Sequence, residues 1–293
     1  MALDSLQTCL FLYACVSITV YSLLVYTVVV ERRKRNAIFQ GSFFSLFLYH
    51  YVADILMFVE FNLLMRARKY GYLNSFFVDP DSPCMTIVPR FSTAVHYHLK
   101  IIDYFGQAVF AANRLSAALM PLDYNKIWSQ RAMWCILVVQ YTLPLAAVLP
   151  VNLNMAYVIQ FVPYPEQNTL RLVNDPESTE VIAYIDLACS LTGTVLSLAM
   201  YAATMVIIRR SVYSAEAVEI RLLLSALLVF MVLTFNTVIQ VSFTHTIDNI
   251  CPILCLILPP LSYPMVDLIY TCQPWALLLS SSVLRSQFLR TFR

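Results

Sequence analysis

Seven ionisable residues lie inside long apolar stretches of the chain, where any chemistry would take place away from water. They are Asp54, Glu60, His96, Lys100, Asp103, Asp186 and Asp267. An ionised group at the centre of a membrane helix costs roughly 2.5–3.5 kcal/mol on insertion scales, so such a group is usually paired or functional. These residue types therefore indicate charge pairing or ligand binding inside a membrane.

Two sets of these residues have different predicted roles. We expect a ligand cavity to be lined by His96, Lys100, Asp103 and Asp186, and a polar core within the membrane to contain Asp54 and Asp267. The alternative for Lys100 and Asp103 is that they pair with each other, because side chains three residues apart are neighbours on a helix.

No catalytic or metal chemistry is predicted from the motifs. The histidines of the HYH motif at 96–98 are two residues apart and point to different helix faces, which disfavours a shared metal ion. No nucleophile–base pair stands at a recognisable spacing, and four glycines leave no Gly-rich phosphate loop. We therefore predict no enzyme activity, no metal, no cofactor and no nucleic-acid partner.

The eight cysteines do not form a metal or disulfide framework. Six of them lie in or at the ends of apolar stretches, where a thiol behaves as a small hydrophobic group. Cys84 and Cys251 fall in predicted outer loops and are a candidate disulfide. Spacing alone does not decide whether they pair.

Composition places these residues on membrane-spanning helices. The chain is 60% hydrophobic and 12% charged, against about 25% charged in typical soluble domains. Spanning a bilayer takes roughly 20 mostly apolar residues per helix, and seven such stretches occur at about 9–30, 41–65, 91–119, 132–151, 181–208, 222–243 and 250–272. Their continuity excludes a β-barrel, and Asp4 before the first stretch argues against a signal peptide. We predict an all-α membrane protein, one seven-transmembrane helix bundle over 1–293.

Lys and Arg residues set the expected orientation. Thirteen of them lie in the loops after the first, third and fifth stretches and in the tail, and five lie on the opposite side. The positive-inside rule therefore places the N-terminus outside and the C-terminus inside. The cluster at 66–69, with three basic residues on the outer side, runs against the rule.

The tail at 273–293 is expected to form a short amphipathic helix on the inner leaflet. Its apolar side would be made by Trp275, Leu278, Leu279 and Phe288, and its arginines would meet anionic lipid. The alternative is an unstructured basic tail.

The sequence "NRLSAALMPLDYNKIW" (113–128) ends the third stretch. Arg114 is eleven residues after Asp103, which is roughly 16 Å along a helix and places it at the inner face. Pro121 would end the helix, and Tyr124 and Trp128 would lie at the membrane boundary. Spacing alone favours a simpler explanation, an arginine whose side chain extends to the interface and a proline in a loop.

This motif resembles the end of the third helix in rhodopsin-like G-protein-coupled receptors. The residues that match the family's pattern in register are Arg114, Ala117, Pro121, Leu122 and Tyr124. Asn113 replaces the family's acid, and "VADILM" (52–57) resembles its second-helix motif, with Asp54 as the conserved aspartate. The sixth and seventh stretches lack the family's Cys-Trp-x-Pro and Asn-Pro-x-x-Tyr. Together with "CQPWALLLSSSVLR" (272–285), the motif is more similar to the nematode serpentine receptor class gamma chemoreceptors.

That resemblance implies a chemosensory receptor in the plasma membrane of a sensory cilium. It would bind an external small molecule and signal through a heterotrimeric G protein, whose coupling residues would be Asn113, Arg114, Pro121, Tyr124 and Lys126. Because Asn113 offers only a neutral acceptor, the usual acid–arginine lock is expected to be weaker or built elsewhere. Glu219, near the inner end of the sixth stretch, is the candidate acid.

A retinal-binding opsin and a membrane transporter are the alternatives to a chemoreceptor. A retinal-binding opsin needs a lysine in the seventh stretch, but the four lysines are Lys34, Lys69, Lys100 and Lys126. A seven-span transporter of a small solute is the alternative from another class. Such carriers are built from repeats, and no motif is shared between the first three and the last three stretches.

Overall fold

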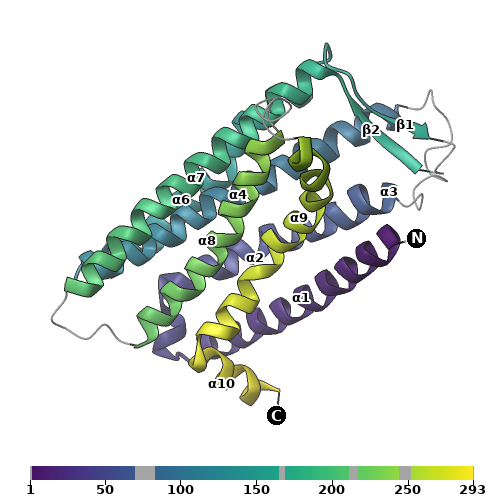
Figure 1. Cartoon of the computed structure of the whole chain (residues 1–293). Helices are drawn as coiled ribbons and strands as arrows, with labels where there is room; N and C mark the ends of the chain where they lie inside the picture. The colour runs from purple at the N-terminus through teal and green to yellow at the C-terminus, as the bar shows by residue number, and fades with distance from the viewer. Residues whose placement is uncertain (1, 70–82, 165–168, 211–216, 244–251, 293) are drawn as a thin grey trace.

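The computed structural model describes residues 2–69, 83–164, 169–210, 217–243 and 252–292, and shows an elongated bundle of long helices (Figure 1). A β-hairpin and the start of α1 lie at one end, called here the hairpin end, and α10 lies at the other, called the α10 end. The helices are α1 (Ala2–Arg33), η1 (Ala37–Gln40), α2 (Ser42–Glu60), η2 (Phe61–Arg66), α3 (Ala67–Lys69), α4 (Cys84–Leu119), α5 (Tyr124–Ile127), α6 (Gln130–Leu153), α7 (Pro176–Arg210), α8 (Ala217–Phe243), α9 (Pro252–Ser280) and α10 (Ser282–Thr291).

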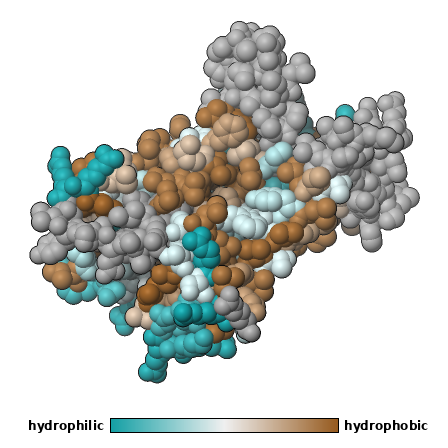
Figure 2. Space-filling view, turned by 60° about the horizontal axis from the view of Figure 1, so that its bottom comes forward, coloured by the Kyte–Doolittle hydropathy of each residue, from teal (hydrophilic) through white to brown (hydrophobic). Residues whose placement is uncertain are grey.

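Four of the described helices are long and apolar enough to cross a membrane. They are Gln7–Arg33, Ser42–Arg66, Gln130–Leu153 and Pro176–Arg210. The protein is therefore a multi-pass membrane protein, and its surface agrees, since apolar side chains such as Leu12, Val138 and Leu198 are exposed. Figure 2 shows a broad hydrophobic surface between hydrophilic edges.

The position of α4 explains why it is absent from that set. It packs against α2, α6, α7 and α8, so protein covers most of its surface. Gly193 lets α7 approach closely, because a Cβ there would lie 2.9 Å from the Tyr104 carbonyl oxygen. A helix in this position can carry many polar side chains.

The polar segment at 152–180 contains a hairpin that the all-α prediction omitted. Strands β1 (Ile159–Tyr164) and β2 (Thr169–Asn174) pair antiparallel, with Ile159 opposite Asn174. Alternate residues Ile159 and Phe161 are buried, and Phe161 packs with Leu170 and Met85 of α4. This period of two is the strand signal that the composition of the segment obscured.

The hairpin end also accounts for the basic cluster that opposed the orientation rule. Arg66 and Arg68 are buried rather than presented to solvent. Arg68 donates to the Leu170 carbonyl at 3.1 Å and lies 5.5 Å from the Phe161 ring. Arg66 and Arg68 thus stabilise the fold. Counting them as loop charges therefore gives no information about the orientation of the chain in the membrane.

The tail prediction needs a correction. α9 continues to Ser280, so Trp275, Leu278 and Leu279 belong to the bundle helix and not to a tail helix. Trp275 donates from Nε1 to Ser17 Oγ of α1 at 2.9 Å. The helix breaks at Ser281, whose hydroxyl accepts from the Leu284 amide and caps α10. Phe288 is on α10, where its ring lies 5.2 Å from that of Phe292.

Candidate functional site

The Lys100 cluster joins three helices inside the bundle. Lys100 Nζ of α4 lies 2.6 Å from Asp186 Oδ2 of α7. Tyr104 donates to the other Asp186 oxygen at 3.1 Å, and Asn236 of α8 donates to the Tyr104 hydroxyl at 2.9 Å. All four residues are buried. The name covers Lys100, Tyr104, Asp186 and Asn236.

This geometry overturns the pairing of Lys100 with Asp103. Asp186 brings its carboxylate across from α7, where it accepts from both Lys100 and Tyr104. A bond between buried groups of opposite charge needs further donors to offset desolvation, and Tyr104 supplies one. Asp103 instead points toward α2.

His96 interacts with Glu60 of α2, whereas Lys100 interacts with Asp186 of α7. His96 Nδ1 lies 3.1 Å from Glu60 Oε2, and Ser92 donates to Glu60 Oε1 at 2.9 Å. The His96 ring also stacks on Phe61, with centroids 6.1 Å apart. The four predicted pocket residues are therefore divided, with His96 and Asp103 facing α2 and Lys100 and Asp186 joining α4 to α7.

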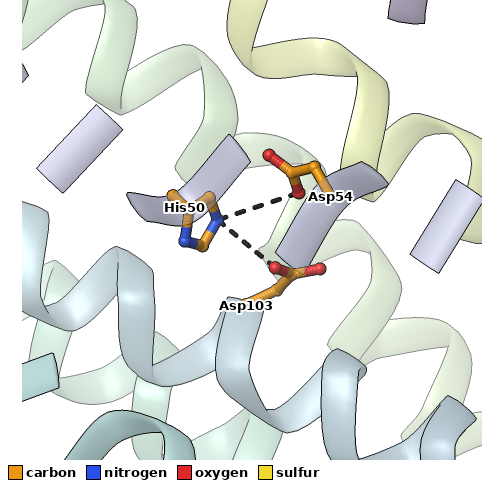
Figure 3. A group of neighbouring side chains, drawn as sticks. All are labelled: His50, Asp54 and Asp103. Carbon is orange, nitrogen blue, oxygen red and sulfur yellow. Dashed lines mark ion pairs between the residues drawn. The ribbon is translucent and has the colours of Figure 1, made fainter. Parts of the chain in front are cut away.

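The acid cluster consists of His50, Asp54 and Asp103 (Figure 3). His50 Nε2 lies 3.3 Å from Asp103 Oδ1 and 4.0 Å from Asp54 Oδ1. All three side chains are buried, and among the described residues the four carboxylate oxygens have no well-formed hydrogen bond, although the Tyr21 hydroxyl of α1 interacts with Asp54. Two neighbouring buried carboxylates do not both stay ionised without compensation.

The acid cluster can therefore share a proton or hold a cation. One ligand atom from each of its three residues lies within 4.8 Å of the others, and histidine nitrogen and carboxylate oxygen suit a transition metal. His50 was not among the residues predicted from the sequence, whose only metal candidates were the histidines at 96–98. The signal was the spacing of four residues between His50 and Asp54, which puts both on one helix face.

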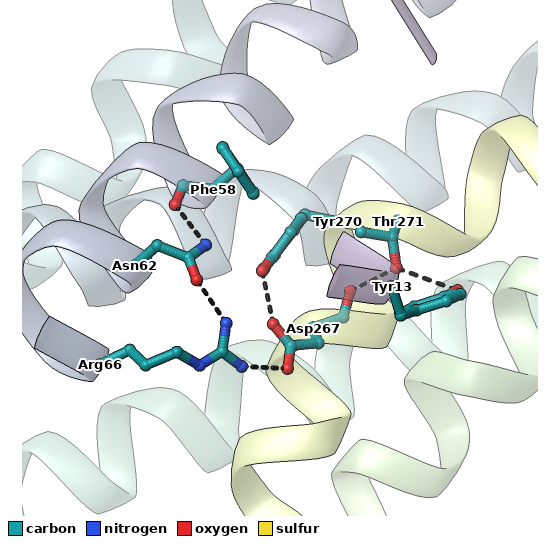
Figure 4. A network of polar contacts seen from close by, with 7 residues as sticks. All are labelled: Tyr13, Phe58, Asn62, Arg66, Asp267, Tyr270 and Thr271. Carbon is teal, nitrogen blue, oxygen red and sulfur yellow. Dashed lines mark hydrogen bonds and ion pairs between the residues drawn. The ribbon is translucent and has the colours of Figure 1, made fainter. Parts of the chain in front are cut away.

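Asp267 pairs with Arg66 rather than with Asp54 (Figure 4). Arg66 Nη2 lies 2.5 Å from Asp267 Oδ2, and Tyr270 donates to Oδ1 at 2.5 Å. Arg66 also donates to Asn62, on the π-helical turn η2. A π-helical turn inserts one residue and rotates the rest of the helix about its axis, which turns Arg66 into the bundle. The predicted polar core of Asp54 and Asp267 is thus two separate contacts.

A closed ring of neutral hydrogen bonds surrounds Asn113 near the α10 end. Asn113 Nδ2 donates to Ser42 Oγ at 2.8 Å, and Tyr124 donates to Asn113 Oδ1 at 3.1 Å. The Ser42 and Tyr124 hydroxyl oxygens are 2.6 Å apart, which closes the ring when Ser42 donates. An asparagine supplies the donor and the acceptor that this ring requires.

Arg114 lies under an aromatic ring next to this network. It is 3% exposed, and its guanidinium carbon is 4.1 Å from the centre of the Phe43 ring. A cation over an aromatic face is attracted by the ring quadrupole, more strongly when desolvated. Ser42 and Phe43 of α2 thus meet Asn113 and Arg114 of α4 as adjacent pairs.

The remaining predicted residues lie around this end or outside the described part. α4 ends at Leu119, two residues before Pro121. Trp128 is buried and donates to Ser116 Oγ at 2.6 Å, whereas Lys126 is exposed and pairs with Asp123. Glu219 is in the backbone of α8, but its side chain lies outside the described residues, as does Cys251, the predicted partner of Cys84.

One comparison with known proteins identifies a family. The model of the family described as "Serpentine type 7TM GPCR chemoreceptor Srv" matches residues 10–293. No curated protein matches the chain. Srv is a different class from the gamma class that the two motifs resembled, and the gamma assignment is not confirmed. The resemblance carried by the motifs around Arg114 and Trp275 thus predicted a serpentine chemoreceptor but not its class.

Proposed function

The chain belongs to the serpentine type 7TM GPCR chemoreceptor Srv family, and on this premise we propose that it is a seven-span receptor for an external small molecule that signals through a heterotrimeric G protein. Its N-terminus is outside the cell and its C-terminus inside. It resides in the plasma membrane, in the cilium of a sensory neuron. The arginines and lysine at 33–35, at the inner end of α1, are exposed at the α10 end, which supports this orientation.

The ligand site in this proposal is the hairpin half of α4. The Lys100 cluster is its recognition element, because it ties α4 to α7 and α8 through Asp186 and Asn236. A ligand that contacts Lys100 or Asp186 changes how firmly these helices are held together. It shifts the population of helix arrangements in proportion to its preference for one of them.

The G-protein side in this proposal is the α10 end of the same helix. The observation that carries the proposal is that Arg114 is held under Phe43 beside the neutral ring of Asn113, Ser42 and Tyr124. These contacts take the place of the acid that Asn113 lacks. Arg114 is fourteen residues from Lys100, or roughly 21 Å along α4, so one rigid helix links the two ends. Glu219 remains the proposed acid on α8.

The test is nucleotide exchange on a G protein reconstituted with the purified receptor. We expect Arg114→Ala to abolish exchange while surface expression stays near that of the unaltered chain. Phe43→Leu should raise exchange without ligand, because it removes a desolvated cation–π contact of about 2 kcal/mol. Phe44→Leu is the matched control, since Phe44 is the next residue, equally buried, and packs in the same aromatic group.

The outcome also separates a receptor from a transporter. Uptake of labelled solute into vesicles, with no nucleotide exchange under any condition, would contradict the receptor function. Exchange that is unchanged in Arg114→Ala would leave the receptor function intact and overturn only the role of Arg114.

A further inference from the structure

An open groove of about 410 Å³ lies between α4 and α6. Its lining residues include Phe105, Ala108, Ala112, Cys135, Val139 and Leu143. Small-molecule sites commonly occupy about 300–1,000 Å³, so the groove is large enough to hold a ligand segment. It lies outside the Lys100 cluster and the acid cluster, and none of the proposed receptor chemistry uses it.

The groove lies at the depth of the hydrocarbon. Ala112 and Ala108 are seven and eleven residues before the end of α4 at Leu119, or roughly 10 and 16 Å along the helix. On α6, Cys135 and Leu143 are five and thirteen residues after the start at Gln130, or roughly 8 and 20 Å. Because a bilayer core is about 30 Å thick, the groove faces lipid tails rather than head groups.

The shape of the groove distinguishes it from an ordinary lipid-facing surface. Its floor is formed by Ala108, which is 8% exposed, while Val139 and Leu143 stand above it at 58% and 52%. Ala108 and Ala112 are four residues apart on one face of α4, so two small side chains in succession leave a furrow between larger neighbours.

The chemistry of the lining is apolar. Gln140 carries an amide into it, but its Nε2 donates inward to the Ile102 carbonyl at 3.2 Å and the side chain is buried. The amide is held above Gly106, where a Cβ would come within 2.9 Å of Gln140 Nε2 and 2.5 Å of His50 Cε1. The walls therefore offer dispersion contacts to a hydrocarbon and no charged anchor for a head group.

We propose that this groove binds the acyl chain of a membrane lipid, which enters from the side of the bilayer. A chain lying in the furrow contacts side chains of α4 and α6 together. It packs against Ala108 below and Val139 beside it, and it gains contacts that a chain on a flat surface does not make.

The experiment uses the full chain in nanodiscs of phosphatidylcholine, a small share of which carries a photoreactive diazirine on one acyl chain. After illumination, cross-linked peptides are mapped by mass spectrometry. We expect segments 105–112 and 135–143 to be labelled more heavily than 191–198 of α7, which is also lipid-facing, with Leu191 and Leu198 exposed. Equal labelling of the three segments would show ordinary surrounding lipid only and would overturn the proposal.

Variants sharpen the test. Ala112→Phe fills the groove and should lower its labelling to the level of the 191–198 segment, because the displaced chain then contacts the surface only as ordinary surrounding lipid does. Cys135→Phe fills it from the exposed wall on α6 and serves if Ala112→Phe does not fold. Ala146→Leu, exposed on α6 and outside the lining, is the control that should change nothing. Unchanged labelling in both filling variants would also overturn the proposal.

Discussion

Two clusters of buried ionisable side chains contain α4 residues that are three positions apart, Lys100 and Asp103. The clusters differ in how their charges are compensated. At Lys100, an ammonium group meets a carboxylate at 2.6 Å, and a tyrosine donates to the second oxygen of that carboxylate. At Asp103, a second carboxylate and a histidine converge instead, and the four carboxylate oxygens have no well-formed hydrogen bond among the described residues. One cluster is compensated by the chain's own groups, whereas the other requires a proton or a cation.

The difference separates two consequences of burying charge. A matched pair holds helices in place, because breaking it leaves an uncompensated charge in the interior. An acid pair is compensated from outside the protein chain, so its state responds to whatever supplies the compensation. The same helix therefore carries one cluster that fixes α7 and α8 and one that can change its charge.

The largest effect is expected from breaking the matched pair. Asp186→Ala leaves Lys100 charged and buried, which should lower the free energy of unfolding by about 3–5 kcal/mol. The double variant Lys100→Met with Asp186→Leu should recover most of that loss, because apolar residues of similar volume replace a buried pair at little cost. Thermal unfolding in detergent measures both. A double variant no better than the single one would contradict the charge explanation.

A smaller effect of opposite sign is expected in the acid cluster. Asp103→Asn removes one of the two acids and supplies an amide that can donate to Asp54. We expect it to raise the free energy of unfolding by roughly 1.5–3 kcal/mol, the value of a hydrogen bond to a charged group. The same unfolding assay applies, with Asp186→Asn as the matched acid-to-amide control. Destabilisation of both variants to the same extent would remove the distinction between the clusters.

The smallest effect concerns Asp175, a half-buried acid whose carboxylate accepts hydrogen bonds from the chain. Asp175 accepts from the amides of Val158 and Ser178. The Ser178 side chain first, and then these two amides, hold the pKa of the Asp175 carboxyl below its usual value. A lowered pKa means that the stabilisation is present at neutral pH and is lost as the pH falls through the folded-state pKa.

Hydrogen exchange at the amides of Val158 and Ser178 measures this effect. Asp175→Asn should weaken their protection at neutral pH and remove its dependence on acid. Glu177→Gln, in the first turn of α7, is the control and should leave both amides protected. Protection that is independent of pH in the unaltered chain would contradict the role given to Asp175.

The helices were largely predictable, and the partners of the buried charges were not. Apolar stretches and Pro121 gave the approximate positions of the long helices, because burial in lipid demands continuous hydrophobicity. The hairpin was missed because its period of two covers only a few residues on each strand. The π-helical turn at η2, which turns Arg66 toward Asp267, has no sequence signal in a single chain.

In the candidate site, too, some residues could be predicted from the sequence and their partners could not. Asn113 and Arg114 were singled out from spacing, but Ser42 and Phe43 were not, since nothing in sequence relates residues 71 positions apart. Lys100 is three residues from one acid, Asp103, and 86 residues from another, Asp186. Its side chain pairs with the distant one. Helix rotation and tilt determine which partner a buried side chain reaches. Rotation and tilt depend on the packing of the whole bundle rather than on the local sequence pattern.

The most direct measurement is the infrared spectrum of the buried carboxyl groups in purified, reconstituted receptor. We expect a band from a protonated carboxyl group, lost in Asp103→Asn and kept in Asp186→Asn, or a carboxylate signal in the unaltered chain that shifts when the bound cation is exchanged. A spectrum of fully ionised carboxylates that responds neither to Asp103→Asn nor to the cations present would contradict the contrast between the two clusters.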